Sequence, residues 1–107
     1  MTYEEIVAKA KSIYENADAS KVKEHLAIQF NIKGEGEGAF YLEIKDGKAV
    51  VEPYQYYDRD VLVTTTADVL IKIASGKLGL EKAYLTGKLS AEGNLGKALL
   101  LKEVKTK

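Results

Sequence analysis

The first apolar residues in the chain recur at helical spacing. Intervals of three or four residues separate Ile6, Ala10, Ile13 and Ala17. Such spacing places side chains on one face of a helix, here over roughly four turns. The preceding Thr2-x-x-Glu5 matches a capping box, in which each side chain accepts a hydrogen bond from the other residue's backbone N–H. We also expect Asp18 to cap a second, short helix that runs through Val22.

From residue 26 the apolar spacing changes to every second position. One face carries Leu26, Ile28, Phe30 and Ile32, and beyond the glycine-rich run 34–38 it continues with Phe40, Leu42 and Ile44. This alternation is typical of strands that bury one face. Asp46-Gly47 is a strong signal for a two-residue hairpin turn, which would pair Ile44 with Ala49 and Leu42 with Val51.

Beyond residue 60 the chain alternates strands with helices. Val61 and Val63 face inward from a fourth strand, and Thr65-x-x-Asp68 predicts a second capping box. The helix that follows ends at Gly76 and buries an apolar face formed by Val69, Leu70 and Ile73.

The last third of the chain contains a helical turn, a strand and a helix. We expect the turn at Ala83-Tyr84, the fifth strand from Gly87 to Ala91, and the helix after Gly93-Asn94. One side of that helix carries Leu95, Ala98, Leu99 and Lys102, and Leu100 and Leu101 widen its apolar arc. The complete order of elements predicts one α+β domain over residues 1–107, with helices covering one face of a mostly antiparallel sheet.

Composition argues against several classes of function. Lys plus Arg equals Asp plus Glu at 16 each, without a basic stripe, so we expect no nucleic-acid partner. The lack of cysteine removes thiolate catalysis, and a single histidine cannot build a His-rich metal centre. There is no apolar run of about 20 residues, no basic apolar leader and no peroxisomal Ser-Lys-Leu ending. We therefore expect a cytoplasmic protein without stable membrane insertion.

Polar clusters offer weak candidates for chemistry. His25 lies beside Glu24 and suggests a general base, but nothing in the sequence places a nucleophile next to it. The three aspartates between residues 58 and 68 do not have the spacing of an EF-hand calcium loop. The run 34–38 lacks the spacing of a phosphate-binding loop, and its two glutamates would repel phosphate. We expect no metal and no cofactor.

Two apolar features are ambiguous. The loop with Tyr54, Tyr56 and Tyr57 either closes one end of the sheet, which we favour, or forms a lid over an apolar site. The final helix carries leucine on more than one face beside Gly96 and Ala98. Small residues beside large ones either leave space for a ligand or allow close packing. The residues alone therefore indicate an α+β domain and leave its function open.

Three short motifs follow one another in the second half of the chain. They are Ser75-Gly76-Lys77-Leu78, then Ala83-Tyr84-Leu85-Thr86-Gly87-Lys88-Leu89, then Glu92-Gly93-Asn94, with Ala98 and Leu101 beyond. In kind, order and spacing they resemble the sterol carrier protein type-2 family. That family shows a Gly-Lys after its third helix, an Ala-aromatic-x-x-Gly-Lys-apolar block, and a Gly-Asn or Gly-Asp before its final helix.

This resemblance implies a five-stranded sheet, helices over one face, and an apolar tunnel between the two layers. It implies a non-catalytic carrier, because members bind sterols, fatty acids, fatty acyl-CoA or phospholipids. Whether Lys77 and Lys88 touch a ligand head group or extend along the strands stays open. The expected cavity wall is apolar and comprises Phe30, Ile32, Phe40, Leu42, Val61, Val63, Val69, Ile73, Leu78, Tyr84, Leu85, Leu95 and Leu99.

Two other functions stay open from the sequence. Many members of the family are modules fused to other domains, so this chain could be an accessory interaction domain with a filled cavity. An enzyme would require Glu24, His25 or Asp60 to share a polar pocket in which their pKa values are shifted. We favour the carrier, whose partner is an apolar small molecule or a lipid.

Overall fold

Five strands form one sheet in the computed structural model, which describes residues 1–105. The strands are β1 (Leu26–Ile32), β2 (Gly38–Lys45), β3 (Lys48–Glu52), β4 (Val61–Thr65) and β5 (Leu89–Gly93). They lie in the order β3-β2-β1-β4-β5, and only β1 and β4 are parallel neighbours. Residues 106 and 107, on which the expectation of no peroxisomal signal partly rests, lie outside the described residues.

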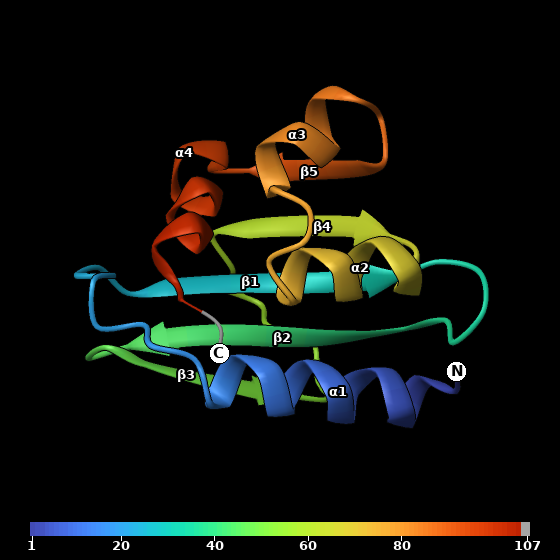
Figure 1. The fold of residues 1–107 in the computed structure, drawn as a ribbon, viewed down its shortest axis with the longest axis horizontal. Coiled ribbons are helices and arrows are strands. Elements are labelled where there is room, and N and C mark those ends of the chain that lie inside the picture. The colour runs from blue at the N-terminus through green and yellow to red at the C-terminus, as the bar shows by residue number, and fades with distance from the viewer. Residues whose placement is uncertain (106–107) are drawn as a thin grey trace.

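The helices lie together on one side of this sheet (Figure 1). They are α1 (Tyr3–Glu15), α2 (Ala67–Ala74), α3 (Leu80–Leu85) and α4 (Leu95–Ala98), which continues as the 3-10 helix η1 (Leu99–Glu103). The predicted α+β class with a mostly antiparallel sheet is confirmed. Among the described residues, no helix is long and apolar enough to cross a membrane.

The core lies between the covered face of the sheet and the helices. The alternate residues that were predicted to face inward on β1 and β2 are all buried, and Phe30 stacks on Phe40 with ring centroids 5.2 Å apart. α1 packs against β3 and α2. Its predicted capping box is present, because Thr2 and Glu5 each accept a hydrogen bond from the other's backbone N–H.

The predicted hairpin is also confirmed. Ile44 pairs with Ala49, and Leu42 pairs with Val51. Asp46 and Gly47 both adopt positive φ, at 53° and 76°. A type I′ turn requires this at both central positions, which explains why Asp-Gly is a reliable signal.

Two expected helix starts are wrong. Residues 18–22 form a turn, because Asp18 is held extended by a backbone bridge to Lys105 while its carboxylate accepts hydrogen bonds from Ser20. The cap of α2 is Thr66 rather than Thr65. Thr65 is instead the last residue of β4, paired with both neighbouring strands, and its hydroxyl donates to the Lys88 carbonyl.

The last strand and the last helix differ from expectation as well. β5 begins two residues later than expected, because Gly87 and Lys88 close α3. The final helix is α-helical only through Ala98 and then tightens to 3-10 geometry. With three residues per turn, Ala98, Leu101 and Val104 align and all three are buried.

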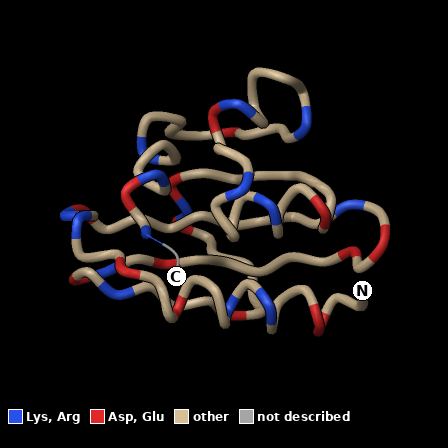
Figure 2. The backbone as a smooth tube through the Cα atoms, viewed as in Figure 1, with Lys and Arg blue, Asp and Glu red and all other residues tan. Residues whose placement is uncertain are grey.

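The face of the sheet away from the helices is partly covered by the tyrosine loop. The Tyr56 N–H donates to the Gln29 side chain, and the Tyr56 ring packs edge-on against Tyr41, with ring centroids 4.9 Å apart. Tyr57 is almost fully exposed. In Figure 2, cationic and anionic residues are interspersed over both layers. Tyr56 therefore covers part of the outer face, whereas the sequence favoured a loop that closes one end of the sheet.

Candidate ligand-binding pocket

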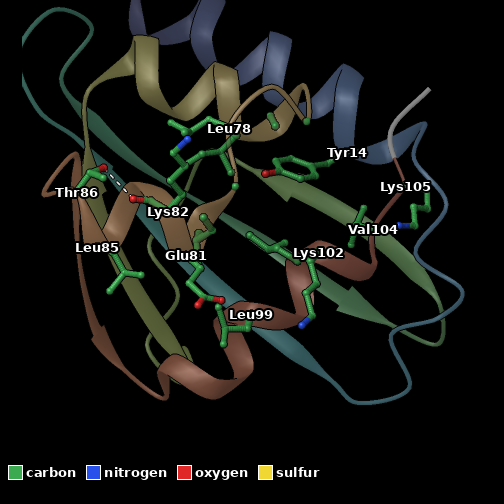
Figure 3. Close-up of a pocket in the computed structure, with 16 residues that line it drawn as sticks. Tyr14, Leu78, Glu81, Lys82, Leu85, Thr86, Leu99, Lys102, Val104 and Lys105 are labelled. Carbon is green, nitrogen blue, oxygen red and sulfur yellow. Dashed lines mark hydrogen bonds between the residues drawn. The ribbon is translucent and has the colours of Figure 1, made fainter.

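A pocket of about 800 Å³ lies among the helices (Figure 3). Its wall is formed by the end of α2, the connection 76–79, α3, η1 and the last turn of α1. This volume lies within the range of small-molecule sites. The apolar part of the wall comprises Ile73, Ala74, Leu78, Leu80, Leu85, Leu99, Leu101 and Val104.

The turn after α2 forms one side of this pocket. Gly76 adopts φ of 78°, its N–H donates to Ile73, and the Lys77 N–H donates to Lys72. This is a Schellman motif, which satisfies the last carbonyls of a helix and redirects the chain. Leu78 follows directly and reaches the pocket wall. The Gly-Lys motif seen in the sequence therefore shapes the pocket through its backbone.

The 3-10 helix forms the opposite side. One row of its side chains is buried in the core, as described above. Leu99 and Lys102, three residues apart on another row, both line the pocket. The change to 3-10 geometry thus lets one short segment contribute to the core and to the pocket.

The rim of the pocket is cationic. Lys82, Lys102 and Lys105 are exposed there, and within the described residues none of them has an ion-pair partner. Glu81 is the acidic residue of the wall. The Thr86 hydroxyl is engaged locally, since it donates to the Lys82 carbonyl. An apolar interior with unpaired ammonium groups at its edge suits an amphiphile with an anionic head.

Tyr14 supplies a polar atom to the interior. The residue is 3% exposed, and its hydroxyl has no hydrogen-bond partner among the described residues. Burial raises the pKa of the Tyr14 hydroxyl above its ordinary value of 10.0, so the group resists ionisation even in alkaline solution. Tyr14 was not identified from the sequence, although Val7, Ala10 and Tyr14 have the spacing of a second buried row on the first helix.

The structure divides the predicted wall residues into three groups. Those that line the pocket are Ile73, Leu78, Leu85 and Leu99. Those buried in the core on the sheet are Phe30, Ile32, Phe40, Leu42, Val61 and Val63, and Val69 packs against that core from α2. Tyr84 and Leu95 are 42% and 36% exposed and do not line the pocket. Contact of any of these residues with a ligand stays a prediction.

Two of the residues considered for catalysis, His25 and Asp60, make structural contacts, whereas Glu24 lines a second pocket beside His25. His25 Nε2 lies 2.6 Å from a Glu43 carboxylate oxygen, and this hydrogen bond lowers the pKa of Glu43. Asp60 accepts hydrogen bonds from the Ala27 N–H and from Lys97. Neither His25 nor Asp60 belongs to the wall of the helical pocket.

Known proteins resemble this chain in sequence. The model of the SCP-2 sterol transfer family matches residues 7–105. Hydroxysteroid dehydrogenase-like protein 2 of Mus musculus is 34% identical over 79 residues, which cover 73% of this chain and 16% of that protein. The same protein of Xenopus tropicalis is 31% identical over 90 residues, covering 83% of this chain and 21% of that protein. The chain thus spans about a fifth or less of these relatives.

Solved structures share the fold. Palmitated SCP2L2 of Aedes aegypti matches with a TM-score of 0.66 at 23% identity, covering 96% of this chain and 93% of that chain. The UbiJ-SCP2 ubiquinone synthesis protein matches with a TM-score of 0.65 at 17% identity, covering 94% and 92%. A double mutant of the sec-alkyl sulfatase PisA1 matches with a TM-score of 0.73 at 18% identity, covering 89% of this chain and 15% of the sulfatase. Because the family model spans residues 7–105 and the fold agrees, the chain belongs to the SCP-2 sterol transfer family.

Proposed function

We propose that this domain is a non-catalytic carrier that binds one lipid-like amphiphile, with an apolar chain, in the pocket among α2, α3 and η1. The observation that carries the proposal is the combination of an apolar interior with three rim lysines that have no ion-pair partner among residues 1–105. Leu85 adds to this, because it is 73% exposed at the pocket and presents an apolar surface to an arriving chain.

The apolar interior supplies the driving force for binding. Each methylene removed from water contributes about 0.8 kcal/mol, so a sixteen-carbon chain gains on the order of 12 kcal/mol before costs. Lost motion and imperfect fit remove much of this gain. Micromolar to nanomolar affinity then follows without a specific polar contact. Such a site distinguishes ligands weakly by the chemistry of the chain.

The rim selects the charge of the head group. Lys82 and Lys102 extend from two different elements of the pocket wall, α3 and η1. Each exposed ion pair contributes up to about 1 kcal/mol. We therefore propose an anionic head, such as a carboxylate or phosphate, at the rim and the apolar chain inside.

A fluorescence titration tests the proposed function. Lipid-stripped protein titrated with cis-parinaric acid should show saturable binding at one site per chain, and palmitate should displace the probe. Changing both Lys82 and Lys102 to Gln should weaken laurate binding by roughly three- to tenfold and leave 1-dodecanol binding unchanged. The exposed Lys9 and Lys33, which lie outside the pocket, provide the matched double substitution. Absence of saturable binding to the wild-type protein would reject the carrier function.

An accessory role in a larger protein is the second candidate. It is favoured by the short span of this chain within its relatives. Native mass spectrometry of the freshly purified protein separates the two functions. Co-purified lipid supports the carrier, whereas a ligand-free mass together with a stable protein partner supports the accessory domain.

A further inference from the structure

The Tyr14 hydroxyl is unusual among the buried polar groups of this protein. Within the described residues it is the only buried side-chain nitrogen or oxygen without a hydrogen-bond partner. Buried polar groups in folded proteins are nearly always paired. Phenylalanine would fill the same space without leaving a hydroxyl unpaired, so packing alone does not account for tyrosine here.

The position of this hydroxyl indicates what it would contact. Tyr14 lies at the last turn of α1 and lines the pocket, and in Figure 3 its oxygen points toward the middle of the wall residues, where neighbouring side chains cover it. The neighbouring wall is apolar, with Ile73, Leu78 and Val104 among its residues. The lysines of the pocket are instead exposed at its rim. The two kinds of polar contact thus differ in exposure, because the Tyr14 hydroxyl is buried and the ammonium groups are exposed.

The chemistry of the hydroxyl limits its partner. A tyrosine hydroxyl is protonated near neutral pH, so it can donate a hydrogen bond. A carboxylate at this depth would lack a cation to compensate its charge, and burying an unpaired charge is strongly unfavourable. A neutral oxygen of a hydroxyl, carbonyl or ether group does not have this difficulty.

Building on the proposed function, we propose that Tyr14 is a specificity-determining residue that donates a hydrogen bond to a neutral oxygen at the inner end of the ligand. The preferred ligand is then bipolar. It carries an anionic head for the lysine rim and a second, uncharged oxygen along or at the end of its apolar chain. A simple fatty acid fills the pocket but leaves the Tyr14 hydroxyl unpaired.

Pairs of ligands test this proposal. Dissociation constants are measured for laurate, myristate and palmitate and for their ω-hydroxy derivatives, with wild-type protein and Tyr14→Phe. The preference is the dissociation constant of the parent acid divided by that of its ω-hydroxy derivative. For at least one chain length, this ratio should be at least five times larger in the wild type than in Tyr14→Phe. α-Hydroxypalmitate, whose hydroxyl stays near the rim, should show the same preference in both proteins. Tyr57→Phe, at a side chain that is 97% exposed, serves as the matched control.

A spectroscopic measurement accompanies the affinities in case Tyr14→Phe folds poorly. In wild-type protein labelled with 13C at tyrosine Cζ, the Tyr14 resonance should move when an ω-hydroxy acid binds, and move differently with the parent acid. This inference is overturned if the wild type and Tyr14→Phe show the same preference and the Tyr14 resonance moves equally with ω-hydroxy and parent acids. The carrier function survives that outcome as long as the wild-type protein still binds the parent acids. If no acid binds to the wild-type protein, this inference and the carrier function are both overturned.

Discussion

Gly87 shows how one backbone conformation closes a helix. It adopts φ of 75°, and its N–H donates to Tyr84 while the Lys88 N–H donates to Ala83, which again forms a Schellman motif. An added Cβ would meet nothing within 4 Å, so any cost of a side chain comes from the backbone. Gly87→Ala should therefore lower the free energy of unfolding by about 1 kcal/mol. Urea denaturation measures the change.

Gly96 is the matched position for this experiment. It lies inside α4, and its φ is not in the positive range. Gly96→Ala should leave stability unchanged or raise it by up to about 1 kcal/mol, because alanine loses less backbone entropy in a helix. Equal effects at the two glycines would contradict the role given to positive φ.

The Glu43 carboxylate links one surface contact to pH. It accepts hydrogen bonds from His25 and from the Tyr56 hydroxyl, and the first of these contributes most to the lowering of the Glu43 pKa. A pKa below the ordinary 4.5 in the folded state means that this contribution to stability is complete above about pH 4.5. It is lost as the pH falls through the lowered pKa of Glu43.

Glu43→Gln tests this dependence. The side chains of His25 and Glu43 are 44% and 26% exposed, so their interaction contributes less than about 1 kcal/mol to the free energy of unfolding. Urea unfolding should show the wild type more stable than Glu43→Gln at pH 7, with the difference shrinking as the pH falls below 4.5. A difference that grows on acidification would show that the sign is wrong.

Individual pocket residues were predictable where a family motif contains them, as with Leu78 and Leu85. Tyr14 was missed because its helix has two adjacent apolar rows. Only the packed structure shows that the row with Tyr14 is the more deeply buried and that its hydroxyl is unpaired. Spacing predicts the face that a side chain occupies, but it contains no information on its hydrogen-bond partners.

At the scale of elements, η1 provides the sharpest test of the pocket. Leu99 is half-buried and lines the pocket, so Leu99→Trp should fill space that a ligand would otherwise occupy. Affinity for palmitate should fall at least tenfold, about 1.4 kcal/mol, while the melting temperature of lipid-free protein holds or rises. Fluorescence competition and differential scanning calorimetry provide the two readouts.

Leu95→Trp is the control for this substitution. Leu95 is in the adjoining helix α4 and does not line the pocket, so binding should be unchanged. If Leu99→Trp instead lowers the melting temperature clearly and leaves binding intact, Leu99 belongs to a close-packed core, and overpacking would cost roughly 1–3 kcal/mol.

Elements with a local chemical signal were predicted well. The capping box of α1 and the Asp46-Gly47 hairpin depend on neighbouring residues, and both are present as expected. The start of α2 was predicted wrongly, because three consecutive threonines are equivalent candidates for its N-cap. The pairing of β4 with both of its neighbours determines which threonine ends the strand and which one caps the helix. The change from α4 to η1 likewise depends on which side chains the rest of the molecule can bury.

At the scale of the molecule, the fold follows from the order of elements and from the family resemblance. The pocket does not, because its wall joins residues from α1, α2, α3 and η1 that lie up to 91 positions apart in the sequence, between Tyr14 and Lys105. The six residues expected to form the tunnel wall on the strands are core residues in this structure, each with 0% to 3% exposure: Phe30, Ile32, Phe40, Leu42, Val61 and Val63. A ligand in the helical pocket therefore contacts the helical residues first.

The location of the bound ligand is the central claim, and an NMR titration tests it most directly. Lipid-stripped, 15N-labelled protein is titrated with palmitate, and the backbone amide shifts are mapped on the structure. We predict saturable shifts that are largest in residues 76–86 and 99–104, with smaller shifts in the tyrosine loop 54–57. Shifts confined to that loop or to the hairpin 45–48, or no saturable shifts, would contradict the account.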